Sequence, residues 1–209
     1  MTHEPVDALS AARLLPVVVL ERADSAAPLA DALLAGGLHC VEITFRTEAA
    51  PEAIAAIVDR SPDLVVGAGT VLTPRQVDQA VGAGARFVVS PGFGPAVVRR
   101  CQELGVPVFP GVATATEIQQ ALDAGVETVK FFPATLLGGP EMLRALSAPF
   151  RTMRFIPTGG VTAENLPDYL AVPSVLAVGG SWLAPPDLVA AGNWPEITRR
   201  TTTALAARF

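Results

Sequence analysis

The 209-residue chain is half apolar, only 17% charged, and carries a formal net charge of -5. This composition excludes an intrinsically disordered chain, and the scattered arginines offer no basic stripe to a nucleic acid. No apolar run is long enough to cross a bilayer and the N-terminus lacks a secretory signal, so we expect a cytoplasmic protein without a membrane partner.

Short apolar segments alternate with alanine-rich, helix-forming segments along the whole chain. The eight predicted strands cover residues 14–20, 40–45, 64–66, 87–89, 106–109, 128–131, 154–156 and 175–178. Capping boxes beginning at Thr73 and Thr114 indicate helix starts between them. Glycines that precede new strands indicate helix ends, at positions 37, 84, 105 and 125.

This alternation of strand and helix predicts a parallel sheet with right-handed crossovers. Eight units favour closure into a (β/α)8 TIM barrel, an α/β fold, and an open doubly wound sheet is the alternative. No linker interrupts the series, so we predict one domain over residues 1–209, with residues 1–10 as an N-terminal extension.

Lys130 is the only lysine among 15 basic residues. The alternation of side chains along a strand turns Lys130 and Phe132 toward the interior of the predicted barrel. Burial disfavours the charged form of an amine, so an inward lysine suits a nucleophile, a task that arginine cannot perform. A buried salt bridge between Lys130 and Glu42 is the structural alternative.

The second predicted strand alternates polar and apolar residues. Glu42, Thr44 and Arg46 share one face, and the apolar residues between them share the face that meets the helices. The barrel interior therefore receives a carboxylate and a guanidinium, which is costly unless something pairs with each charge. A structural ion pair between Glu42 and Arg46 is the alternative to a catalytic role.

Loops that follow strands form the active-site end of a barrel. Residues 67–70 bring backbone N–H groups and the Thr70 hydroxyl to this end, which suits a carboxylate. Residues 157–162 and 179–181 follow the seventh and eighth predicted strands, where barrels often bind phosphate. Their glycines let the backbone approach an anion closely.

Several other chemistries are disfavoured by absence. The only histidines are His3 and His39, which leaves no histidine triad and argues against a zinc-dependent aldolase. No glycine-rich dinucleotide fingerprint follows the first strand. Cys40 and Cys101 lie in apolar segments and are predicted to be buried free thiols. We therefore expect neither a metal nor a cofactor.

Six segments closely resemble motifs of the 2-keto-3-deoxy-6-phosphogluconate (KDPG) aldolase family, also described as 4-hydroxy-2-oxoglutarate (KHG) aldolases. They are residues 41–47, 67–72, 90–92, 129–134, 157–160 and 179–183. The resemblance runs from Leu15 to the end of the chain. It implies a metal-free class I aldolase with a (β/α)8 barrel, a homotrimer, at the last step of the Entner-Doudoroff pathway, yielding pyruvate and glyceraldehyde 3-phosphate.

The resemblance also implies roles for single residues. Lys130 forms a Schiff base with the ketone of a phosphorylated 2-keto acid, and Glu42 moves protons. Arg46 and Thr70 hold the substrate carboxylate. Pro91 and Phe132 shape the pyruvyl pocket. The remaining substrate-binding residues, four of which receive the phosphate, are Thr158 and then Gly159, Gly160, Gly180 and Ser181.

Three alternatives stay open. The similar phosphogalactonate aldolases usually lack an arginine at the position of Arg46, so Arg46 favours the gluconate-type reaction. An aldolase acting on KHG is the second, and Phe93, where family members tend to carry leucine, leaves the breadth of substrates open. A phosphate-binding barrel that is an isomerase or a sugar-phosphate sensor is the third, and it leaves the inward lysine without a purpose.

Overall fold

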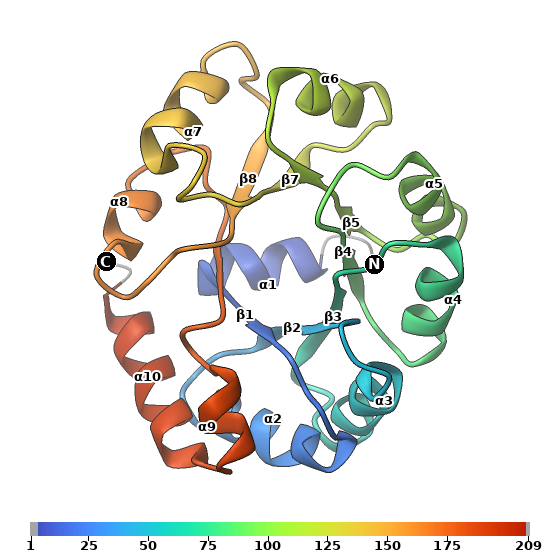
Figure 1. The fold of residues 1–209 in the computed structure, drawn as a ribbon, viewed down its shortest axis with the longest axis vertical. Helices are drawn as coiled ribbons and strands as arrows, with labels where there is room; N and C mark the ends of the chain where they lie inside the picture. Colours follow the sequence, from blue (N-terminus) through green and yellow to red (C-terminus); the bar gives the residue numbers. More distant parts are fainter. Residues whose placement is uncertain (1–3, 208–209) are drawn as a thin grey trace.

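In the computed structural model, which describes residues 4–207, helices form an outer ring around short strands (Figure 1). All strand pairings are parallel, which confirms the predicted α/β class. The strands are β1 (Leu14–Val18), β2 (Cys40–Thr44), β3 (Val65–Gly69), β4 (Phe87–Val89), β5 (Val108–Phe109), β6 (Gly111–Val112), β7 (Thr128–Phe131), β8 (Arg154–Pro157) and β9 (Val178–Gly180).

The helices alternate with these strands. They are α1 (Glu4–Ala12), α2 (Ala26–Ala35), α3 (Ala50–Arg60), α4 (Pro74–Gly82), α5 (Pro95–Glu103), α6 (Ala115–Asp123), α7 (Gly139–Ser147), α8 (Leu166–Leu170), α9 (Pro186–Ala190) and α10 (Trp194–Ala206), with a 3₁₀ helix η1 (Ala23–Ser25) before α2. Within residues 4–207, no helix is long and apolar enough to span a membrane.

The strands form two sheets. One has six strands in the order β5-β4-β3-β2-β1-β9, and the other has three in the order β6-β7-β8. The prediction of eight strands in one sheet differs from this: the fifth predicted strand, at residues 106–109, is observed only as β5 at residues 108–109, and a separate short strand, β6, follows it. Pro110 stands between β5 and β6 and has no N–H to donate to a ladder. Isolated bridges from Phe155 to Val175 and from Thr158 to Gly179 run between the two sheets.

Two glycine-containing segments that were predicted as loops are strands. Residues 67–69 complete β3, which pairs with β2 along its whole length, and Gly179 and Gly180 belong to β9. In β3 the missing side chains make room for neighbours. A Cβ at Gly67 would lie 2.1 Å from the Phe87 ring, and one at Gly69 would lie 2.0 Å from the Glu42 carboxylate. Glycine is a poor strand former by propensity, so the sequence pattern placed these boundaries wrongly.

The two sheets face a common interior. Lys130 on β7 donates a hydrogen bond to Glu42 on β2, although 88 residues separate them and the two strands belong to different sheets. Helix α1 immediately precedes β1, so it lies at the end where the parallel strands begin, and Figure 1 shows it across the centre of the ring. Its Leu9 is fully buried. The opposite end, where the strands finish, is the mouth.

The N-terminal extension predicted for residues 1–10 is helical where the structure describes it, as part of α1. Residues 1–3, which include His3, lie outside the described residues.

Helix ends largely follow the predicted signals. Thr114 and Glu117 form a reciprocal capping box at the start of α6. At α4, Thr73 accepts a hydrogen bond from the Gln76 N–H, but the Gln76 side chain accepts from the Leu72 N–H instead of completing the box. Left-handed φ angles confirm the glycines predicted after helices, at positions 37, 84, 105 and 125.

Cys40 and Cys101 are buried free thiols, as predicted. Burial raises the pKa of each from an ordinary value of 9.0 to about 12. At pH values between these two pKa values, the unfolded chain binds fewer protons than the folded one. The free energy of unfolding is therefore expected to fall as pH rises above about 9, by up to about 1.4 kcal/mol per pH unit for each thiol.

Urea unfolding at pH 8 and pH 10 checks this expectation. The double variant Cys40→Ala, Cys101→Ala is the control, because it keeps every other titrating group and should lose less stability over this range. Equal losses in the two proteins would contradict the assignment.

Candidate active site

Lys130 and Glu42 form an ion pair inside the molecule. Their side chains are 6% and 1% exposed, and 3.5 Å separates Lys130 Nζ from Glu42 Oε1. Both point inward, as the strand alternation predicts. This distance is long for a hydrogen bond, so the pair is held loosely. Two charges removed from water at this depth cost several kcal/mol that such a contact only partly offsets, which favours a chemical over a purely structural role.

Two oxygens on the inward face of β2 have no hydrogen-bond partner within the described structure: Glu42 Oε2 and Thr44 Oγ1. Thr44 is fully buried. An unsatisfied buried polar atom costs about 1–3 kcal/mol and is expected where a water or a ligand completes the network. The alternation along β2 predicts that Thr44 lies on this face. Only the three-dimensional structure shows that its hydroxyl has no hydrogen-bond partner among the described residues.

Phe132 and the loop after β4 border the lysine. The centroid of the Phe132 ring lies 5.5 Å from Lys130 Nζ. Lys130 pairs with Gly111 of β6, and a Cβ at Gly111 would lie 2.1 Å from the Pro91 carbonyl oxygen. The Pro91 loop therefore packs directly against the strand next to Lys130. A side chain at position 111 would force these segments apart.

A hollow of about 170 Å³ brings together most of the residues predicted to bind substrate. From the predicted set it is lined by Arg46, Phe132, Thr158, Gly159, Gly160, Gly180 and Ser181. Arg46 is the only charged residue among the lining residues, so the hollow suits an anion. Left-handed φ angles of 98° at Gly159 and 76° at Gly160 require glycine there and bring backbone close to any ligand.

Arg46 lies at the mouth and not, as predicted, inside the barrel. β2 ends at Thr44, and Arg46 is exposed in the turn that follows. The Phe45 N–H makes the last bond to β3, at Gly69 O, and β3 ends at that residue. Among residues 4–207 no ion pair joins Arg46 to Glu42, so that structural alternative is wrong.

Thr70 and Pro91 are predicted site residues outside the lining of this hollow. Thr70 is half-buried with a left-handed φ of 56°, and it follows Gly69, whose backbone lies against Glu42. Ser90 Oγ donates to Gly92 O at 2.8 Å and fixes the turn that contains Pro91. Thr70 thus follows the residue that lies against Glu42, and Pro91 lies against the strand that pairs with Lys130.

The sequence and the fold are similar to those of known proteins. The family model described as KDPG and KHG aldolase matches residues 6–200. The chain belongs to this family. The 2-dehydro-3-deoxy-phosphogluconate aldolase of Treponema pallidum is 55% identical over 192 residues, which cover 92% of this chain and 91% of the relative. The KHG/KDPG aldolase of Escherichia coli K12 is 44% identical, covering 91% and 90%.

A solved structure of the family agrees with the fold. The KDPG aldolase of Legionella pneumophila, which holds pyruvate captured at low pH as a covalent carbinolamine intermediate, superimposes with a TM-score of 0.91. It is 41% identical, and the match covers 95% of this chain and 96% of that one.

Gly69→Ala is expected to lower kcat/KM by about 100-fold or more, because the new Cβ would lie 2.0 Å from Glu42 Oε1 and must displace the carboxylate. Steady-state kinetics on KDPG check this. Gly82→Ala is the control, since a Cβ there meets nothing within 4 Å. Wild-type activity in the Gly69 variant would show that the position of Glu42 does not matter.

Proposed function

We propose that this chain is a class I aldolase that cleaves KDPG to pyruvate and glyceraldehyde 3-phosphate through a Schiff base on Lys130. The observation that carries the proposal is the single lysine of the chain, buried in the interior 3.5 Å from the Glu42 carboxylate. Membership of the aldolase family supports it. A sugar-phosphate sensor, or an isomerase that uses Glu42 as its base, needs no nucleophilic amine.

The reaction divides between Lys130 and Glu42. Lys130 Nζ attacks C2 of the substrate, and loss of water from the carbinolamine gives a cationic imine. The imine draws the electrons of the C3–C4 bond while Glu42, through a water, takes the proton of the C4 hydroxyl, so C4 leaves as the aldehyde carbon. Glu42 returns a proton to C3, and water hydrolyses the imine to free pyruvate and the amine. The unsatisfied Glu42 Oε2 is available to bind that water.

The substrate would lie along the line from Lys130 to the glycine loops. Arg46 and Thr70 hold the carboxylate at the mouth, and Pro91 and Phe132 enclose the pyruvyl group. The phosphate is received by the backbone at the ends of β8 and β9, at Gly159, Gly160, Gly180 and Ser181, and Thr158 is a further substrate-binding residue. The cationic character of the hollow supports an anionic substrate.

We further propose that the two sheets close into a (β/α)8 barrel forming a single domain over residues 1–209. The strand order supports closure, since β9 lies beside β1 and no point reverses the order, as it would in an open doubly wound sheet. The bridges between the β8 and β9 segments also support it. A cytoplasmic homotrimer in the Entner-Doudoroff pathway is proposed from the family resemblance alone.

Release of pyruvate from KDPG tests the proposed function. We expect kcat/KM to be highest for KDPG and lower for its galactonate epimer, for which Arg46 is the unfavourable feature. KHG cleavage to pyruvate and glyoxylate is the second candidate activity, because the E. coli relative is named for both substrates. Folded protein that releases no pyruvate from any of the three would refute an aldolase.

A further inference from the structure

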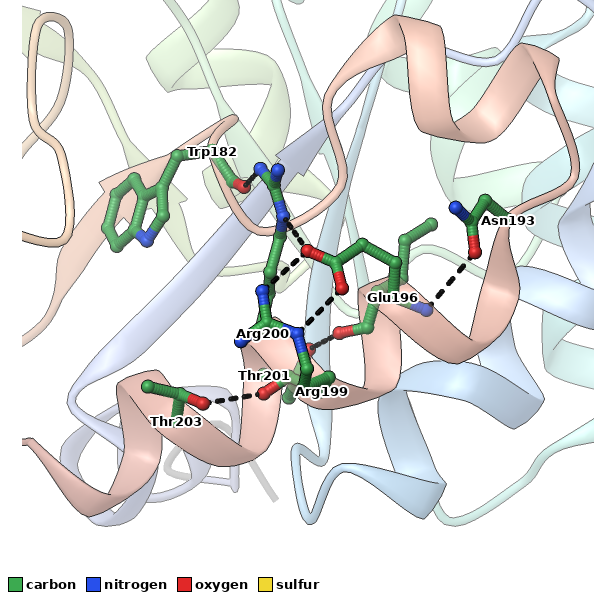
Figure 2. Close-up of polar contacts among 8 residues, drawn as sticks. Trp182, Asn193, Glu196, Arg199, Arg200, Thr201 and Thr203 are labelled. Atoms are coloured by element: carbon green, nitrogen blue, oxygen red, sulfur yellow. Dashed lines mark hydrogen bonds and ion pairs between the residues drawn. The ribbon is translucent and has the colours of Figure 1, made fainter.

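Helix α10 carries a cluster of charged residues beside the loop after β9. Figure 2 shows Glu196 between two arginines: it accepts hydrogen bonds from the Arg199 guanidinium at 2.6 Å and from Arg200 Nε at 2.9 Å. These bonds, with Arg199 as the larger cause, lower the pKa of Glu196 to about 2. Glu196 is therefore a fixed anion at any physiological pH, and it holds the two guanidinium groups in place.

Only one of the two arginines reaches the loop. Arg200 Nη1 donates to the backbone oxygen of Trp182 at 2.9 Å, across 18 residues of sequence (Figure 2). Within residues 4–207, the Arg199 guanidinium bonds to Glu196 alone and is 65% exposed, against 36% for Arg200. The two adjacent arginines thus share Glu196 as a partner, and only Arg200 also bonds to Trp182.

The Trp182 side chain packs against the backbone of the segment predicted to bind phosphate. A Cβ at Gly180 would lie 1.6 Å from Trp182 Cζ3, so the indole ring packs directly on the Gly180 backbone. Gly180 and Ser181 line the hollow that contains Arg46. Trp182 also borders a second hollow of about 400 Å³, whose lining includes Arg199, Arg200 and Thr162. Packing around Trp182 is incomplete at this hollow, so the hydrogen bond that Arg200 alone donates to the Trp182 carbonyl can fix the position of this residue.

We propose that Arg200 is a positioning residue for Gly180 and Ser181, where β9 ends and the loop after it begins, and that it sets the preference of this enzyme for phosphorylated over unphosphorylated 2-keto acid substrates. The proposal rests on the proposed function. Arg200 touches no substrate: it fixes the Trp182 carbonyl, Trp182 fixes Gly180, and the backbone at Gly180 and Ser181 receives the phosphate. Backbone donors bind an anion well only when their orientation is set before binding.

The test compares Arg200→Met with Arg199→Met on KDPG and on KHG, which has no phosphate. Both variants remove one positive charge and one partner of Glu196, but only the first releases Trp182. We expect Arg200→Met to raise the KM for KDPG about tenfold with kcat within about twofold, the loss expected for one charge-assisted hydrogen bond. Both constants for KHG should stay within about twofold, and Arg199→Met should match the wild type on both substrates.

Other results would overturn the proposal. If Arg200→Met lost activity equally on KDPG and on KHG, Arg200 would have a general structural role. If Arg200→Met and Arg199→Met changed the kinetic constants equally, the effect would come from the loss of surface charge alone. Arg200→Lys keeps the charge with fewer hydrogen-bond donors. It should raise the KM for KDPG and not for KHG, by a smaller factor than Arg200→Met, so it preserves the test if Arg200→Met does not fold. Borohydride trapping of pyruvate is independent of phosphate. No adduct in the wild type would therefore refute the proposed function and not the role of Arg200.

Discussion

Lys130→Met is expected to abolish the adduct that pyruvate and borohydride form with this protein and to lower kcat/KM by about 10⁴- to 10⁶-fold, the range seen when a covalent nucleophile is removed. The sequence makes this measurement unusually clean. Lys130 is the only lysine, so the N-terminal amine is the one other primary amine in the chain. Intact-mass analysis after reduction reads the result directly.

The matched control is Lys130→Arg. It keeps a cation opposite Glu42, whereas Lys130→Met leaves a carboxylate that is 1% exposed without its partner, a change that costs about 3–5 kcal/mol when the charge persists. Arginine cannot form the imine, so the adduct should vanish in both variants while Lys130→Arg stays the more stable in urea unfolding. An adduct of unchanged yield in either variant would place the Schiff base on another amine.

The placement of Lys130 and Glu42 was predictable because a strand has a fixed period of two. Once residues 40–45 and 128–131 are recognised as strands, the inward face of each follows, and both side chains point where that rule puts them. The α/β class follows in the same way from the alternation of strands and helices. These features depend on local patterns that the chain repeats, which is why the sequence suffices for them.

The strand ends were less predictable, and Arg46 shows why. The alternation rule applies only while the strand continues, and β2 stops at Thr44 because its neighbour β3 offers no partner beyond Gly69. The length of one strand therefore depends on the length of another, which no local pattern contains. The glycine at position 69 also depends on a residue that is distant in sequence. A side chain there would collide with the Glu42 carboxylate, which no local pattern around Gly69 reveals.

Contacts from distant helices were outside the reach of sequence patterns altogether. Arg200 looks like one more surface arginine in an amphipathic helix, and Glu196 like its i,i+4 partner. Only the fold brings its guanidinium to the Trp182 carbonyl, behind the loop that was predicted to bind phosphate. Sequence motifs identified the loop, and the structure adds what holds it.

Glu42→Gln is expected to lower kcat by about 10²- to 10⁴-fold, the usual contribution of a positioned acid or base. Glutamine has nearly the same shape and still accepts a hydrogen bond from Lys130, so the change removes the proton carrier with little change in packing. The most specific readout is exchange of the pyruvate methyl protons in D₂O, followed by NMR. This exchange needs Lys130 to form the imine and Glu42 to move the proton at C3.

The Glu42 variant should therefore still be trapped by borohydride, more slowly than the wild type, while methyl exchange falls with kcat. Glu42→Asp is the control, because it keeps the carboxylate but draws it back by one methylene from Lys130 Nζ, already 3.5 Å away. We expect it to retain an intermediate exchange rate. Exchange at the wild-type rate in Glu42→Gln would assign the proton transfer to another group, and the buried pair would then serve only to hold the lysine.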